Sequence, residues 1–157
     1  MPSKPVAVET GANRGIGFTI VWSLCKQFSG DVYQTACDVE RGKAAVAELQ
    51  AEGLKLLFHQ LDTNDLQSIR SLRDFLKEKY GGLNVLVNNA GIAFKDDDPT
   101  PFHIIAKITV KTNFFGTRNI CKELLLALIK LQEDKLTISN ALCFASEAKG
   151  PTSAGIL

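Results

Sequence analysis

Short apolar runs alternate along the chain with longer segments whose apolar residues recur every three or four positions. The short runs predict buried strands, because strands covered on both faces of a sheet are continuously apolar. The longer segments predict helices, and each ends at a glycine that can stop a helix. The predicted strands span residues 6–8, 32–36, 54–59 and 85–87, and the predicted helices span 16–28, 41–52 and 63–80.

A long amphipathic stretch over residues 102–131 predicts another helix, and a last strand follows at either 136–138 or 142–145. Strict alternation of this kind is typical of α/β proteins with a parallel, doubly wound sheet. We predict an incomplete Rossmann-type sheet of about five strands in the order 3-2-1-4-5, in one truncated dinucleotide-binding domain over residues 1–157. Its fifth strand would be an open edge, which favours self-association.

Composition narrows the class of protein. The 157 residues are 45% hydrophobic and 22% charged, as in one globular domain, and a net charge of +1 gives no reason to expect nucleic acid or membrane partners. Four scattered cysteines and two histidines predict no metal site. Without an apolar segment typical of a secretory signal or a membrane span, we expect a cytoplasmic protein.

The sequence T-G-A-N-R-G-I-G, residues 10–17, follows the first predicted strand and opens the first predicted helix. Gly11 permits a tight turn, Gly15 lets the backbone approach a pyrophosphate, and Gly17 lets the helix pack close to the sheet. A phosphate would bind at the helix N-terminus. The pattern indicates a dinucleotide site, the alternative being glycines that only shape a turn.

Several segments carry a closer resemblance. The spacing TGxxxGxG, the run Asn88-Asn89-Ala90-Gly91 after the fourth strand, and the segments "RGKAAVAELQAEG", "GGLNVLVNNAGIAFK" and "KTNFFGTRN" resemble short-chain dehydrogenase/reductases. The resemblance is strongest to the vertebrate NADPH-dependent carbonyl reductases. It covers about residues 5–130, and the tail diverges from about residue 131. It implies NADPH-dependent reduction of ketones, aldehydes or quinones to alcohols, with a small-molecule carbonyl substrate.

The resemblance also implies roles for individual residues. Arg14 would lie against the 2′-phosphate of NADPH, and Asp62 would accept from the adenine amino group. Asn113 matches the family's active-site asparagine, which holds a water in the proton relay; taken alone, it is only a polar residue within a helix. The cofactor-binding residues implied are Gly11, Asn13, Arg14, Gly15, Ile16, Gly17, Asp62, Asn89, Ala90 and Gly91.

The family's catalytic signature is missing. In the family, a tyrosine protonates the carbonyl oxygen, a lysine four residues later lowers the tyrosine pKa, and a serine hydrogen-bonds the same oxygen. Neither tyrosine qualifies, because Cys37 lies four residues after Tyr33 and Asn84 four residues after Tyr80. Ser139 or Ser146 could stand in the serine's place, and we favour Ser146 because it follows the apolar run Leu-Cys-Phe-Ala.

One substitution and the acidic residue next to it bear on the expected choice of cofactor. Cys37 stands where the reductases typically have an arginine that would pair with the 2′-phosphate. Asp38 lies about twenty residues past Gly17, where an acid can bind a ribose 2′-hydroxyl and favour NAD. Because Arg14 remains, we expect NADPH ahead of NAD.

Polar residues also interrupt the predicted strands. Glu9 replaces an apolar residue at the end of the first strand, where an unpaired carboxylate is costly or becomes protonated. Gln34 adds a smaller burden in the next strand. The sequence leaves three readings open: a carbonyl reductase, a non-catalytic NADP(H)-binding isoform or interaction protein, and a truncation product with an unstable fold.

Overall fold

A computed structural model describes residues 4–11, 15–125, 137–140 and 155–156 of the chain. The strands are β1 (Val6–Thr10), β2 (Asp31–Ala36), β3 (Leu57–Gln60), β4 (Val85–Asn88), β5 (Ile92–Ala93), β6 (Thr137–Asn140) and β7 (Gly155–Ile156). The helices are α1 (Gly15–Gln27), α2 (Val39–Ala51), α3 (Leu66–Tyr80), α4 (Phe102–Val110) and α5 (Thr117–Ile120), with π-helical segments η1 (Lys111–Gly116) and η2 (Cys121–Leu125).

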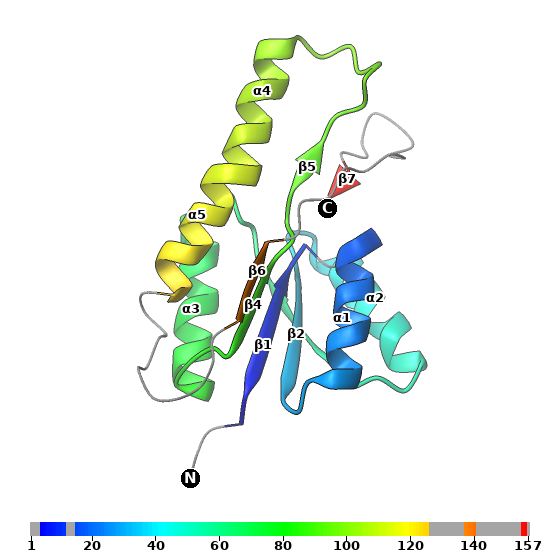
Figure 1. Ribbon diagram of the computed structural model, residues 1–157, viewed down its shortest axis with the longest axis vertical. Coiled ribbons are helices and arrows are strands. Elements are labelled where there is room, and N and C mark those ends of the chain that lie inside the picture. Colours follow the sequence, from blue (N-terminus) through cyan, green and yellow to red (C-terminus); the bar gives the residue numbers. More distant parts are fainter. Residues whose placement is uncertain (1–3, 12–14, 126–136, 141–154, 157) are drawn as a thin grey trace.

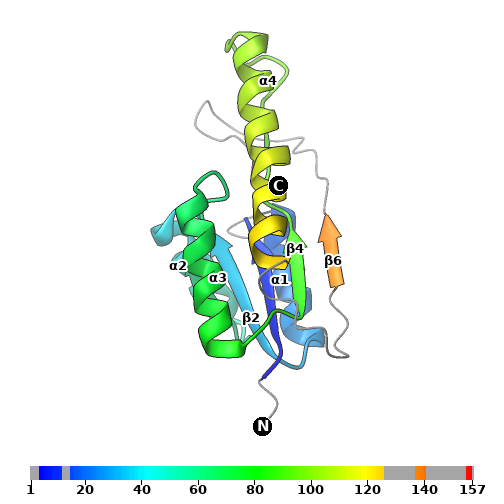
Figure 2. The same ribbon diagram turned by 90° about the vertical axis from the view of Figure 1, so that its left-hand side faces the viewer.

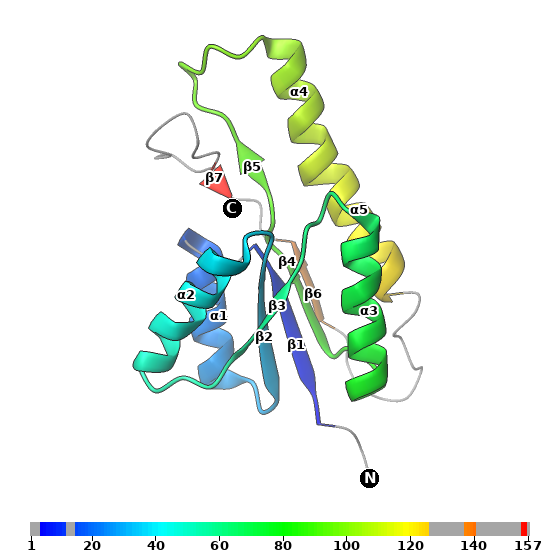
Figure 3. The same cartoon turned by 180° about the vertical axis from the view of Figure 1, so that it is seen from behind.

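One parallel sheet organises these elements, in the order β3-β2-β1-β4-β6. Helices α1 and α2 cover one face, while α3 and the helical rod from α4 to η2 lie on the other (Figure 1; Figure 3). The predicted order 3-2-1-4-5 is confirmed, with β6 as the fifth strand beside β4 (Figure 2). The first predicted position of this strand, 136–138, overlaps β6, whereas 142–145 lies outside the described residues.

The central strand β1 is buried along its whole length, which explains its apolar start. Its side chains alternate between two cores: Val6 and Val8 pack with α3 and the helical rod, and Ala7 packs with α1 and α2. The core beneath α3 also holds Leu61, Ile69, Leu72, Leu76, Leu86, Ile120 and Leu124.

The helix ends follow the expected capping chemistry. Asp65 begins α3 by accepting a hydrogen bond from the Gln67 amide at 2.9 Å. Gly81, at a φ of 69°, ends α3 in the left-handed conformation that glycine adopts most easily. Gly53 turns the chain after α2 with a φ of 84°. Both predicted stops are confirmed.

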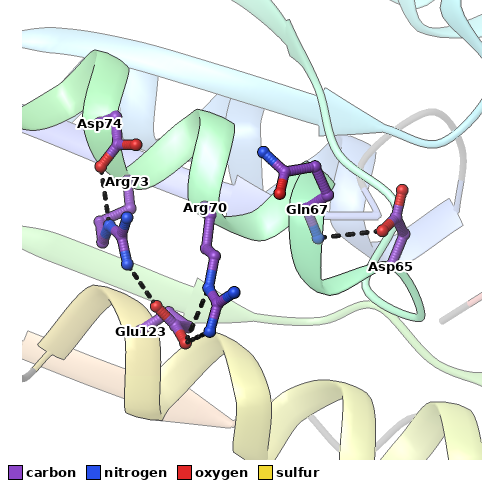
Figure 4. Close-up of polar contacts among 6 residues, drawn as sticks. All are labelled: Asp65, Gln67, Arg70, Arg73, Asp74 and Glu123. Carbon is purple, nitrogen blue, oxygen red and sulfur yellow. Dashed lines mark hydrogen bonds and ion pairs between the residues drawn. The ribbon is translucent and has the colours of Figure 1, made fainter.

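An ion-pair cluster ties α3 to the helical rod (Figure 4). Glu123 of η2 accepts from the guanidinium groups of Arg70 at 3.4 Å and Arg73 at 2.5 Å. The Glu123 side chain is only 14% exposed, so this cluster is better shielded from solvent than an ordinary surface pair. Arg73 also donates to Asp74 at 2.8 Å.

The spacing of apolar residues along the sequence predicts core faces that begin at Ile16 in α1 and at Leu66 in α3. The structure corrects both faces and one strand boundary. In α1, Gly17 and Val21 are buried, while Ile16 is 44% exposed and Ile20 lines a surface groove. In α3, Leu66 is exposed instead of buried, because it is the first helical residue and precedes the packed turns. The third strand begins at Leu57, since the chain is still leaving the turn after α2 at residue 54.

Helix α4 makes little contact with the rest of the protein. None of its residues is buried, and α4 extends beyond the sheet (Figure 1). Within the described ranges, no helix has the length and apolar character needed to cross a bilayer. Large exposed apolar side chains of α4 and η1 are Phe102, Ile104, Ile108, Val110, Phe114 and Phe115.

Candidate functional site

The carboxyl ends of β1 and β4 are joined by one threonine. The buried hydroxyl of Thr10 accepts hydrogen bonds from the backbone N–H groups of Asn89 at 3.1 Å and Ala90 at 3.0 Å. Since β1 and β4 are neighbours in the sheet, these bonds fix the two loops that follow them relative to each other. Sequence reasoning gave Thr10 no role, although its place directly before Gly11 was a usable signal.

Gly11 and Gly15 both adopt positive φ values, the conformation that the glycine pattern of this loop leads us to expect. Gly11 has a φ of +79°, and a Cβ added to it would lie 2.8 Å from the Cα of Ala90, so the loop after β4 excludes any side chain there. Gly15 begins α1 at a φ of +64°, and among the described residues outside its own helix no atom lies within 4 Å of an added Cβ. This leaves the backbone at the helix N-terminus open to approach by an anion, as a pyrophosphate requires.

The structure describes two of the four other loop residues that the resemblance assigns to the cofactor, Ile16 and Gly17. Gly17 is buried in the first turn of α1, where it lets the helix lie close to the sheet, and Ile16 lies beside it at the surface. Asn13 and Arg14, for which the resemblance implied cofactor contacts, lie outside the described residues.

A second corner of the site forms at the ends of β2 and β3. Asp38 is the N-cap of α2: it accepts from the Arg41 amide at 2.9 Å and lies 3.7 Å from the Arg41 guanidinium. Asp62 follows β3 and accepts from the Asn64 amide at 2.8 Å. Burial, and then the neighbouring Asp62 carboxylate, raise the pKa of the Cys37 thiol. Cys37, where the resemblance leads us to expect an arginine, therefore lies near the carboxylates of Asp62 and Asp38, and Asp38 pairs with Arg41.

Asn113 lies near Gly91, at the other end of the candidate site from Asp38 and Asp62. Its side chain accepts from the Ile92 amide at 2.7 Å and donates to the Ile92 carbonyl at 2.8 Å, which fixes β5 just after Gly91. Asn113 lies in the π-helical segment η1, a distortion often found at functional sites. The structure thus gathers Asn89, Ala90, Gly91 and Asn113 at one edge, although the clamp on Ile92 was not predicted.

Asn89 itself is almost fully buried. Its side-chain amide donates to the Gly11 carbonyl at 3.5 Å, and its side-chain oxygen has no partner among the described residues. Asn88 points to the opposite face, where its amide lies 3.5 Å from the sulfur of Cys121. The side-chain oxygens of Asn88 and Asn89, which have no partner in the described part of the chain, are groups that a bound polar ligand or water could satisfy.

The two tyrosines lie at the other edge of the sheet. The Tyr80 hydroxyl donates to Asp31 at 2.6 Å and lies 3.1 Å from the Tyr33 hydroxyl, to which Lys79 donates at 3.0 Å. Asp31 pairs in register with Val6 at the start of β1, so this network is at the amino edge, opposite Gly11. Neither tyrosine is available to the candidate site.

Of the two serines considered for the catalytic position, only Ser139 lies in the described part of the chain. Ser139 lies in β6, in register with Val87 of β4. Ser146, the favoured position, lies outside the described residues. Among the described residues, no cluster of three or more histidine, cysteine or acidic side chains is arranged to hold a metal ion.

Known proteins match this chain over most of its length. Carbonyl reductase (NADPH) 1 of Homo sapiens is 65% identical over 137 residues, which cover 87% of this chain and 49% of that protein. Carbonyl reductase (NADPH) 3 of Homo sapiens is 64% identical over 138 residues, covering 88% and 50%. The chain therefore spans about half the length of the curated relatives it matches.

Solved structures agree with the sequence comparison. Salutaridine reductase from Papaver somniferum superposes with a TM-score of 0.77 at 30% identity, covering 87% of this chain and 56% of that one. A metagenomic short-chain oxidoreductase in complex with NADP gives a TM-score of 0.74 at 28% identity, covering 94% and 66%. The short chain dehydrogenase family matches residues 5–144. This chain belongs to the short chain dehydrogenase family.

Proposed function

We propose that this chain is the dinucleotide-binding part of a carbonyl reductase-type protein and that it binds NADP(H) without turning over a carbonyl substrate by itself. The close approach of Gly11 to Ala90 carries this proposal. Only glycine fits at that position, where the loop after β1 lies against the loop after β4. Ligands of open α/β sheets bind outside the carboxyl ends of the strands, where both loops lie.

The described residues fit such a ligand. Gly11 and Gly15 would hold the pyrophosphate through their backbone, supported by the N-terminus of α1. Asn89, Ala90 and Gly91 would line the nicotinamide-side ribose, with Asn113 holding the following segment in place. When bound, NADPH would supply a hydride to the carbonyl carbon. The chain would bind and orient it.

Proton donation is the step that this chain lacks. The 157 residues contain no YxxxK pair, and Tyr33 and Tyr80 are committed to the network at the amino edge. General-acid assistance is worth about two to four decades in rate. We therefore expect binding with little or no reduction of a ketone, aldehyde or quinone, although such small carbonyl compounds are the substrate class that the relatives' names suggest. A cytoplasmic location belongs to the same proposal.

Cofactor choice follows from the corner near Cys37. Asp38 and Asp62 disfavour a 2′-phosphate, and Arg41 is partly neutralised by Asp38. Arg14, by the family resemblance, would supply the remaining cation. We propose NADP(H) as the preferred ligand, with a smaller margin over NAD(H) than an arginine at position 37 would give.

A second candidate function is interaction with a protein. Six of the large exposed apolar side chains lie on α4 and η1, and no described strand pairs with the outer side of β6. Exposed apolar surface and open strand edges favour association. Sedimentation equilibrium over a hundredfold range of concentration would detect self-association, and a monomer throughout would remove it.

The proposed function is tested by titrating the purified chain with NADPH, following the nucleotide fluorescence, and then supplying a small quinone. Saturable binding without oxidation of NADPH supports the proposal. Quinone-dependent oxidation well above that of a heat-denatured control would contradict the claim about turnover. A chain that melts cooperatively but binds neither NADPH nor NADH would contradict the claim about binding.

A further inference from the structure

The helical rod from α4 to η2 packs on the rest of the protein along one narrow stripe. Over its described residues, 102–125, the buried positions recur every four residues and none lies in α4: Thr112, Gly116, Ile120 and Leu124. Residues four apart share one face of a helix, so these four mark the face that packs. Thr112 has the only polar side chain of the four, and it is the one closest to α4.

The hydroxyl of Thr112 contacts the loop that follows β3. It accepts a hydrogen bond from the side-chain amide of Asn64 at 3.1 Å, and the Asn64 side-chain oxygen lies 3.5 Å from the same hydroxyl. One turn further along the rod, this loop lies against Gly116, where an added Cβ would be 3.1 Å from the Thr63 carbonyl oxygen. One polar contact and one close backbone contact therefore join the loop after β3 to η1.

The same loop carries Asp62, for which the resemblance implies a contact with adenine. The Asp62 carboxylate accepts from the backbone N–H of Asn64 at 2.8 Å, and the backbone N–H of Asp62 donates to the Ser68 hydroxyl at 2.9 Å. Asn64 therefore bonds to Asp62 through its backbone and to Thr112 through its side chain. A movement of the Asp62 corner is transmitted to η1 through this one residue.

Asn113, the next residue of η1, lies at the other end of the candidate site. Its side chain makes two hydrogen bonds with the backbone of Ile92, directly after Gly91. Packing of α4 does not fix Asn113, because no residue of α4 is buried, and the π-helical turns of η1 depart from regular α-helical geometry. The contact between Thr112 and Asn64 therefore sets where this end of the rod, and with it Asn113, lies.

We propose that Asn64 and Thr112 are positioning residues for Asn113: their hydrogen bond couples the loop that carries Asp62 to the segment that follows Gly91. A ligand that fixes Asp62 then also steadies the contact of Asn113 with Ile92. Binding of the adenosine part of a dinucleotide thereby prepares the nicotinamide side of the site. This consequence rests on the proposed function, whereas the dependence of the Asn113 contact on Thr112 does not.

The first test needs no cofactor. Hydrogen exchange at the Ile92 amide, which donates to Asn113, is followed by NMR in the wild type, Thr112→Val, Thr112→Ser and Thr109→Val. Valine keeps the shape of threonine without the hydroxyl, serine keeps the hydroxyl, and Thr109 is a half-buried threonine one turn earlier, on α4. We expect exchange at Ile92 to be at least about threefold faster in Thr112→Val and unchanged in the other two variants.

A reference amide separates this effect from a general loss of stability. Leu86 is fully buried in β4, so its exchange reports opening of the sheet. The increase at Ile92 should exceed any increase at Leu86. Asn64→Ala removes the same contact from an exposed residue and should act as Thr112→Val does, even if the latter fails to fold. An equal increase at both amides, or no increase at Ile92 in either variant, overturns the proposal.

The second test adds the adenosine part of the ligand alone, as adenosine 2′,5′-bisphosphate. It should slow exchange at Ile92 in the wild type and in Thr109→Val, but not in Thr112→Val. NADPH should also bind about three- to tenfold more weakly to Thr112→Val than to Thr109→Val. If the bisphosphate slows exchange at Ile92 equally in all three proteins, the proposal is overturned. If exchange at Ile92 depends on Thr112 while no nucleotide binds the wild type, the positioning role stands and the proposed function fails.

Discussion

Glu9 and Gln34 stand directly opposite each other on adjacent central strands, both fully buried, with no hydrogen-bond partner for either side chain among the described residues. Burying an unpaired polar group costs about 1–3 kcal/mol in proteins. Packing alone does not explain these two polar residues, because Ala7 and Val32 of the same strands are apolar. A role at the candidate site explains them better.

Replacing this pair with apolar residues should stabilise the fold. We expect the double variant Glu9→Val and Gln34→Leu to raise the free energy of unfolding at pH 7 by about 2 kcal/mol. Urea unfolding measures the change, with Glu48→Val on the exposed face of α2 as the control, for which we expect about zero. A double variant less stable than the wild type would show that the pair has partners that stabilise it.

The tyrosine network should give the protein an alkaline limit. Burial and hydrogen bonds with Asp31 and Tyr33 raise the pKa of Tyr80 far above its ordinary value. Because the folded pKa exceeds the unfolded value of about 10, this stabilisation is complete below about pH 10 and is lost as the pH rises through the folded pKa. The free energy of unfolding of the wild type should therefore fall as the pH rises above about 10, and the absorbance of ionised tyrosine should rise with it.

Tyr80→Phe removes the hydroxyl that donates to Asp31 at 2.6 Å. We expect the free energy of unfolding to fall by about 1–2 kcal/mol at pH 7, and the difference from the wild type to shrink above about pH 10. Urea unfolding at both pH values checks this. A constant difference at all pH values would contradict the assignment of the alkaline limit to Tyr80.

The ion pairs of Glu123 should contribute more to the free energy of unfolding than fully exposed ion pairs do. We expect Glu123→Gln to lower the free energy of unfolding by about 1 kcal/mol, because two arginines of α3 lose a partly buried partner. The effect should shrink in about 1 M salt. Glu78→Gln, exposed on α3 and without an ion pair in the described part of the chain, is the control. Equal losses in both variants would contradict this account.

Cys37 should control the preference between the two nicotinamide nucleotides. We expect Cys37→Arg to tighten NADPH binding about tenfold and to leave NADH binding nearly unchanged, because a guanidinium pairs with the 2′-phosphate alone. Ser71→Arg, exposed on α3, adds the same charge at a distance and should change neither. Equal gains for both nucleotides in Cys37→Arg would indicate a general charge effect.

The sheet was predictable because its signals are local. Continuous apolar runs set the strands, and Gly53, Asp65 and Gly81 set the ends of the helices that connect them. The face of α1 was not predictable from spacing. The buried residues of α1 are Gly17 and Val21, so the helix packs on the sheet through the side that carries them, and Ile16 faces outward.

The site was predictable in its glycines and less so in its contacts. Gly11 and Gly15 follow from the loop pattern, because positive φ values and close backbone approach demand glycine. The pairing of Glu9 with Gln34 depends on register between strands, and the clamp of Asn113 on Ile92 depends on a contact 21 residues apart in the chain. Neither relation has a signal within a short window of sequence.

The central claim is that the loops after β1 and β4, which meet at Gly11 and Ala90, bind NADP(H), and NADPH titration of two glycine variants tests it most directly. Gly11→Ala and Gly53→Ala both place a side chain at a positive φ, but only at position 11 would the new Cβ meet the loop after β4. NADPH fluorescence titration should show saturable binding in the wild type and in Gly53→Ala, and at least about tenfold weaker binding in Gly11→Ala. Equal NADPH affinity in all three proteins, or no saturable binding in a folded wild type, would contradict the claim.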